Sequence, residues 1–65
     1  MLYVNLTRPS GKPLAVNPNW VSAIERDEER GLTKVEIGSG LYYWVTEPMA
    51  VVIARCEANA NRGSV

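Results

Sequence analysis

Side chains that could support catalysis are scarce in this chain. It has no histidine, and histidine is the commonest general base, the usual partner of a serine or cysteine nucleophile, and the commonest metal ligand. Its five glycines do not have the spacing of a loop that binds phosphate. The sequence therefore predicts a protein that is not an enzyme and that uses no cofactor.

Two features could still bind or react. The acidic run Asp27-Glu28-Glu29 could hold a divalent cation, but it lacks the alternating ligand positions of a calcium loop, so we interpret it as a solvated loop. The only cysteine, Cys56, cannot form an internal disulfide or complete a zinc or iron–sulfur site. Cys56 could be a reactive thiol, but its place on an apolar helical stripe favours an inert core residue. No metal site is predicted.

Length and charge limit the classes of partner. The chain has 65 residues, enough for one small domain, and its seven basic residues balance its seven acidic ones. A neutral chain produces no field that attracts nucleic acid or an anionic membrane. There is no leader-like N-terminus and no apolar stretch of the roughly 20 residues that span a bilayer. We expect a cytoplasmic protein with no membrane insertion, and the small core favours a homo-oligomer, most simply a dimer.

The elements that position these side chains are organised around residues 33–53. Val35 and Ile37 alternate with polar residues, which indicates a half-buried strand. The turn Gly38-Ser39-Gly40 leads into a returning strand at residues 41–45, rich in aromatic and β-branched side chains. A helix should begin between residues 46 and 49.

Strands are also predicted before this hairpin. Residues 2–7 alternate, turn formers fill residues 8–13, and residues 14–16 suit a short second strand. Asn17-Pro18-Asn19 is a turn. Residues 20–26 fit either one helical turn or a strand, and we favour a strand that ends near Glu25, followed by a charged loop.

Either Thr46 or Glu47 could cap the helix, with Pro48 in its first turn. Helical spacing from Met49 places Val52, Ile53 and Cys56 on a narrow apolar stripe that should lie on the sheet. The predicted fold class is α+β: a small antiparallel sheet or partly open barrel of four to five strands, with one C-terminal helix packed on it. Residues 1–58 form the domain, and residues 59–65 form a polar, frayed tail.

Because nothing catalytic is predicted, function should lie in a binding surface. Alternation puts Tyr42 and Trp44 on one face of their strand, projecting outward beside Tyr3 if the other face is core. Aromatic residues with polar atoms are enriched at protein contacts, although a sheet that curled into a barrel would cover these rings. A second candidate contact face is the side of the helix opposite the stripe, where the alternative is simple helix formers: Val51, Ala54 and Ala58.

An ordered series of residues carries a family resemblance. The series is Leu6-Thr7-Arg8, Gly11-Lys12, Val16-Asn17-Pro18, Val21, Ile24-Glu25, Thr33, Val35, Ile37, Gly40, Val45, Glu47 and Val52. Over residues 6–53 the chain resembles the small flagellar proteins of the FlbD/SwrD type. The resemblance implies a cytoplasmic accessory factor that supports motor power or swarming through protein contacts, with a flagellar motor component as its partner.

Two alternatives stay open. The chain departs from the family in its extended loop at residues 27–31, its aromatic strand, Pro48 and its longer tail, so a phage or mobile-element accessory or structural protein could use the same fold. The opening residues, with Leu6-Thr7-Arg8 and Gly11, are also similar to the carbon-storage regulator family of RNA-binding dimers. The neutral charge and the acidic residues at 25–29 argue against that family and against a nucleic-acid partner.

Overall fold

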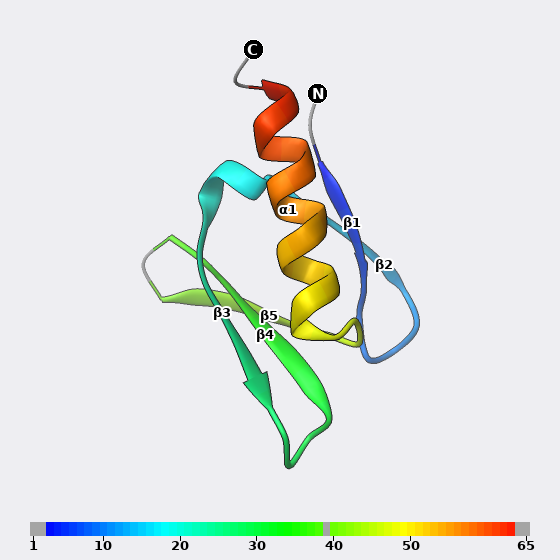
Figure 1. Ribbon diagram of the computed structural model, residues 1–65. Coiled ribbons are helices and arrows are strands. Elements are labelled where there is room, and N and C mark those ends of the chain that lie inside the picture. The colour runs from blue at the N-terminus through cyan, green and yellow to red at the C-terminus, as the bar shows by residue number, and fades with distance from the viewer. Residues whose placement is uncertain (1–2, 39, 64–65) are drawn as a thin grey trace.

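The computed structural model describes residues 3–38 and 40–63, with side chains described as far as Asn59. Two antiparallel sheets and one C-terminal helix make up the fold, which confirms the predicted α+β class (Figure 1). In chain order the elements are β1 (Val4–Thr7), β2 (Pro13–Val16), the 3₁₀ helix η1 (Pro18–Trp20), β3 (Val21–Asp27), β4 (Leu32–Ile37), β5 (Leu41–Val45) and α1 (Met49–Gly63).

β1 and β2 form a two-stranded sheet whose turn depends on a glycine. Leu6 lies opposite Leu14 in the register. At the turn, the Arg8 N–H donates to the Lys12 carbonyl at 2.9 Å. Gly11 has a φ of 91°, in the left-handed region that side chains with a Cβ avoid. The turn formers at residues 8–13 thus make a tight hairpin, as predicted.

The ambiguous segment at residues 20–26 divides between two elements. The Asn17 side chain accepts a hydrogen bond from the Asn19 N–H at 2.9 Å, which starts the 3₁₀ helix. Trp20 ends that helix, and β3 begins at Val21 and continues to Asp27. The prediction of a turn followed by a strand is confirmed, and the strand extends two residues beyond its expected end at Glu25.

β3, β4 and β5 form the second sheet, with β4 in the centre. Val35 lies opposite Ile24 on one side and Tyr43 on the other. The β4–β5 turn ends at Gly40, which has a φ of 87°. The predicted bounds of β5 are confirmed.

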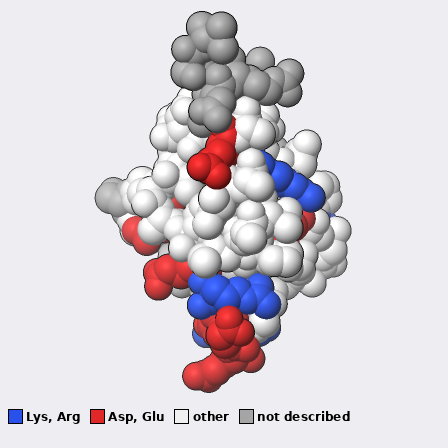
Figure 2. All heavy atoms as spheres, in the orientation of Figure 1, with Lys and Arg blue, Asp and Glu red and all other residues white. Residues whose placement is uncertain are grey.

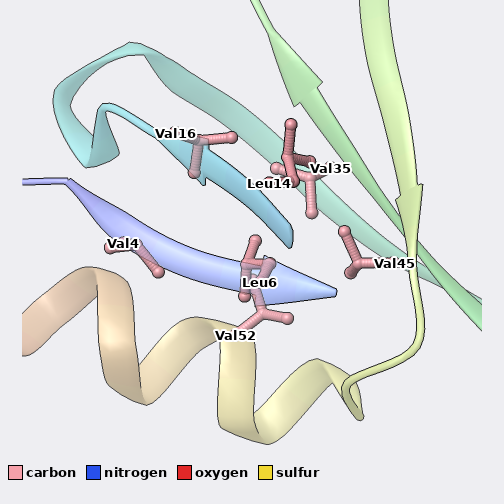
Figure 3. Close-up of a cluster of buried hydrophobic side chains, with 7 residues drawn as sticks. All are labelled: Val4, Leu6, Leu14, Val16, Val35, Val45 and Val52. Atoms are coloured by element: carbon pink, nitrogen blue, oxygen red, sulfur yellow. The ribbon is translucent and has the colours of Figure 1, made fainter. Parts of the chain in front are cut away.

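The core lies between the two sheets and the helix (Figure 3). α1 runs alongside β1 with the sheets behind it (Figure 1), and its Val52 side chain points toward Leu6. Among the described residues the buried apolar side chains are Val4, Leu6, Leu14, Val16, Val35, Val45 and Val52. Most of these side chains are valines, so the core is small in volume as well as in number.

The predicted helical stripe is partly wrong. Val52 is fully buried and Cys56 packs against the core, as expected, but Ile53 is 37% exposed. Ile53 is rotated about 100° from Val52 around the helix. The two small sheets cover too narrow a strip of α1 to reach it. α1 also extends to Gly63, so the backbone of residues 59–63 continues the helix; residues 64–65 of the expected tail lie outside the described residues, and the division at residue 58 stays a prediction.

Glu47 joins the two sheets and the helix. Its carboxylate accepts hydrogen bonds from the Thr7 N–H at 2.9 Å and the Thr7 hydroxyl at 2.8 Å. The buried Thr33 hydroxyl donates to the Glu47 carbonyl at 2.6 Å, and the Thr46 N–H donates to the Thr7 carbonyl at 2.9 Å. The carboxylate expected to cap α1 is therefore bonded to β1 instead.

Candidate functional site

The candidate site is the outer face of the β3–β4–β5 sheet. Val45 is buried against the core, so alternation along β5 turns Tyr42 and Trp44 away from it. Lys34 lies directly opposite Trp44 on β4. We call Arg30, Lys34, Tyr42 and Trp44 the outer aromatic face.

The side chains of the outer aromatic face contact one another closely. The rings of Tyr42 and Trp44 are 5.9 Å apart and nearly perpendicular at 84°. The Lys34 ammonium lies 4.5 Å from the centre of the Tyr42 ring, and the Arg30 guanidinium lies 4.6 Å from the Trp44 ring. Edge-to-face rings and cations over rings each stabilise such a cluster. The two rings and the two cations thus pack against one another on this face.

The rings keep access to solvent. Tyr42 is 46% exposed, and Trp44 is half-buried, with Arg30 lying over its ring. α1 packs against β1, β3 and η1. The alternative in which the sheet curls over and buries both rings is therefore wrong, because Tyr42 remains exposed.

Charges of both signs surround the aromatic pair. In the register Glu25 lies opposite Lys34, and Glu36 lies opposite Tyr42. Arg30 is 3.8 Å from the carboxylate of Asp27. On the side of the molecule that carries α1, Figure 2 shows acidic side chains at the lower end, at the tip of the β3–β4 hairpin, with basic side chains directly beside them. This mixture of charges does not make a surface for phosphate.

Tyr3 does not lie beside Tyr42 and Trp44, contrary to expectation. It lines a groove of about 190 Å³ together with Leu41 and Tyr43, which point to the opposite side of β5. Tyr3 precedes β1, and β1 packs over the inner side of the three-stranded sheet. We call this space, lined by Tyr3, residues 14–17, Trp20, Ile37, Leu41 and Tyr43, the apolar groove.

The sequence did not point to Trp20 or Leu41 as surface residues. Leu41 shares the face of buried Val45, yet it is 56% exposed, and Trp20 is 67% exposed. Burial falls along the inner face of β5 from Val45 through Tyr43 to Leu41. The buried end lies next to Thr46, whose N–H donates to the Thr7 carbonyl of β1. The available signal for Trp20 was its position directly after the turn at Pro18.

The second predicted contact face, on α1, consists of small side chains. Val51 is half-buried, whereas Ala54 and Ala58 are exposed. A cavity of about 440 Å³ lies beside this face of the helix, against Arg55, Asn59 and the start of β1. Arg55 is already engaged there, because it donates to the Asn5 carbonyl at 2.8 Å.

The two remaining candidates for reaction or metal binding are Cys56 and the acidic run at residues 27–29. Cys56 is half-buried, and burial raises the pKa of its thiol, which disfavours the reactive thiolate. Asp27 accepts a hydrogen bond from the Arg30 N–H at 3.0 Å. Within residues 3–38 and 40–63, the structure shows no cluster of three metal-ligating side chains and no helix long and apolar enough to cross a membrane.

Comparison of the chain with protein-family models, with curated proteins and with solved structures returned no match. Function is therefore inferred from the chain's own residues and geometry, together with the resemblance described above.

Proposed function

We propose that this protein is a non-catalytic protein-binding module and that the outer aromatic face is its contact surface. The observation that carries the proposal is the Tyr42–Trp44 pair, held edge to face with a cation over each ring on the outer side of the sheet. Trp, Tyr and Arg are the residues that most often dominate binding energy at protein interfaces. Side chains that already pack against one another lose less conformational entropy when a partner binds than free ones do.

The charges favour a protein over RNA as the partner. Aromatic rings beside basic residues can also stack nucleic-acid bases, which is what a carbon-storage regulator-like function would need. Here Glu25 and Glu36 share the face with Lys34, and they would repel phosphates. Any binding to single-stranded RNA should therefore be weak, and a titration with salt would reveal it because phosphate-driven binding falls steeply with ionic strength.

The resemblance gives the proposal its finer form. We propose a cytoplasmic accessory factor that supports flagellar motor power or swarming by binding a motor component. The residues that carry the resemblance occupy turns, the Thr7–Glu47 junction and the core, so they support a shared fold more directly than a shared partner. A phage or mobile-element protein with a different partner remains the alternative.

A two-hybrid screen of the host's own genome, with the full chain as bait, tests the proposal. The double variant Tyr42→Ser/Trp44→Ser should lose at least one partner that the wild type selects, since truncating one interface aromatic costs about 2 kcal/mol or more. Ile53→Ser is the matched control, because it removes an exposed apolar side chain from α1 instead. A double variant that kept every partner at unchanged affinity would refute this use of the outer aromatic face.

Swarming gives an independent readout of the finer proposal. In a strain that lacks its FlbD/SwrD-type protein, the wild-type chain should restore swarming and the double variant should not, with both present at equal levels. Restoration by neither chain, while the two-hybrid partners are phage structural proteins, would favour the alternative.

A further inference from the structure

The apolar groove gathers the most exposed apolar side chains of the molecule. Among the described residues the three large hydrophobic side chains with the greatest exposure are Trp20, Leu41 and Tyr3, at 67%, 56% and 48%. All three line the groove. Isolated exposed apolar residues are ordinary, but a contiguous group in a concave site marks an interaction surface.

The groove runs along a strand. Residues 14–17 all line it, although alternation would turn only every second side chain of β2 toward one face. Across the groove lie Leu41 and Tyr43 of β5. In the described sheets β2 pairs only with β1, and β5 pairs only with β4. Strands with one open edge can accept an added strand from another chain.

The volume of the groove excludes a drug-sized ligand as its occupant. It measures about 190 Å³, whereas pockets for drug-sized molecules span roughly 300–1,000 Å³. There is room for one or two apolar side chains.

The exposed area also argues against a second copy of this chain. Trp20, Leu41 and Tyr3 together expose on the order of 300 Å², given that an aromatic side chain buries 150–250 Å² in all. A stable interface needs roughly 800 Å² from each partner. The groove is therefore too small to hold a dimer together on its own, whereas a short extended segment would fill it.

The charge near the groove indicates which charge its occupant should carry. None of the described residues that line the groove is charged. The Arg8 guanidinium lies 5.5 Å from the centre of the Tyr43 ring, which lines the groove. Within the described part of the chain, neither ion pair involves Arg8. An acidic side chain on the occupant would find its complement there.

We propose that the apolar groove binds an extended segment of a partner protein, apolar at alternate positions and acidic at the end near Tyr43. The segment lies along β2 and β5, places its apolar side chains against Trp20 and Leu41, and pairs its carboxylate with Arg8. This site lies on the opposite side of β5 from the outer aromatic face. It deepens the proposed protein-binding function without sharing its contact residues.

A peptide selection tests this proposal. The full chain is immobilised, and a displayed library of random peptides of about six residues, the length of a typical strand, is selected for binding to it. Enriched peptides should alternate apolar residues and carry Asp or Glu at one end. The affinity of the most enriched peptide is then measured by fluorescence anisotropy. Leu41→Ser should weaken it about tenfold or more, and Ile53→Ser should leave it unchanged.

Arg8→Gln tests the charge. This substitution should lower the affinity for the acidic peptide several-fold and leave the affinity for its Asp→Asn or Glu→Gln counterpart unchanged. If Leu41→Ser fails to melt cooperatively, Trp20→Ser replaces it, because the Trp20 side chain is more exposed than that of Leu41, at 67% against 56%.

Three outcomes would overturn the inference: no enriched motif, enrichment of basic peptides, or equal affinity for the groove variants. Each leaves the two-hybrid result for Tyr42→Ser/Trp44→Ser untouched, so the two proposals fail separately.

Discussion

Glu47 connects three parts of the fold through one side chain. Its carboxylate binds both Thr7 donors, and Arg55 lies 3.5 Å away. Burial acts to raise the pKa of Glu47, but the hydrogen bonds from Thr7 and the charge of Arg55 outweigh it, so the pKa lies below the ordinary value of 4.5. The folded state therefore favours the charged carboxylate.

This shift predicts acid sensitivity. Stability from Glu47 is fully present above pH 4.5, the ordinary value, and is lost as the pH falls through the lower pKa of the folded state. Glu47→Gln should cost about 1–2 kcal/mol at neutral pH and flatten the decline in acid. Urea unfolding from pH 7 to pH 3 measures both effects, with the exposed carboxyl variant Glu57→Gln as control. Equal pH profiles for wild type and Glu47→Gln would contradict the assignment.

At the scale of the element, α1 is anchored through Val52. Val52→Asp would bury an unpaired charge among valines and leucines, a change that costs several kcal/mol. We expect the variant to lose its cooperative thermal transition in circular dichroism. Ile53→Asp is the matched control on the same helix, and it should change stability by less than about 1 kcal/mol because the side chain is partly exposed. The reverse order of the two effects would show that the helix packs through another face.

The elements also show where sequence patterns suffice. Alternation and turn chemistry predicted β5, the hairpins and the placement of Tyr42 and Trp44 on one face of β5, because these depend on neighbours a few residues away. Which face of β5 is buried stayed open in the sequence and is decided by the structure. The exposure of Leu41, Trp20 and Ile53 could not be predicted from alternation and turn chemistry. It depends on how far the opposite layer extends, and that is set by contacts such as Thr7 to Glu47, which are forty residues apart in the chain.

At the scale of the whole molecule, the core is small for a stable fold. The buried apolar side chains of the described residues are five valines and two leucines, and chains of this length bury only about 60% of their unfolded surface. We therefore propose a homodimer. Light scattering at micromolar concentration should give about twice the 7.2 kDa of one chain, and the melting temperature should rise with concentration. A mass of 7.2 kDa with a melt independent of concentration would contradict the dimer.

We propose that a partner protein binds at the outer aromatic face. NMR tests this proposal. The amide and indole chemical shifts of the labelled full chain are recorded while the partner from the two-hybrid screen is added. The largest changes should fall on the Trp44 indole and on the amides of Lys34, Tyr42 and Trp44, with α1 unaffected. Changes confined to Val51, Ala54 and Ala58, with the Trp44 indole unmoved, would contradict the claim and move the contact surface to the helix.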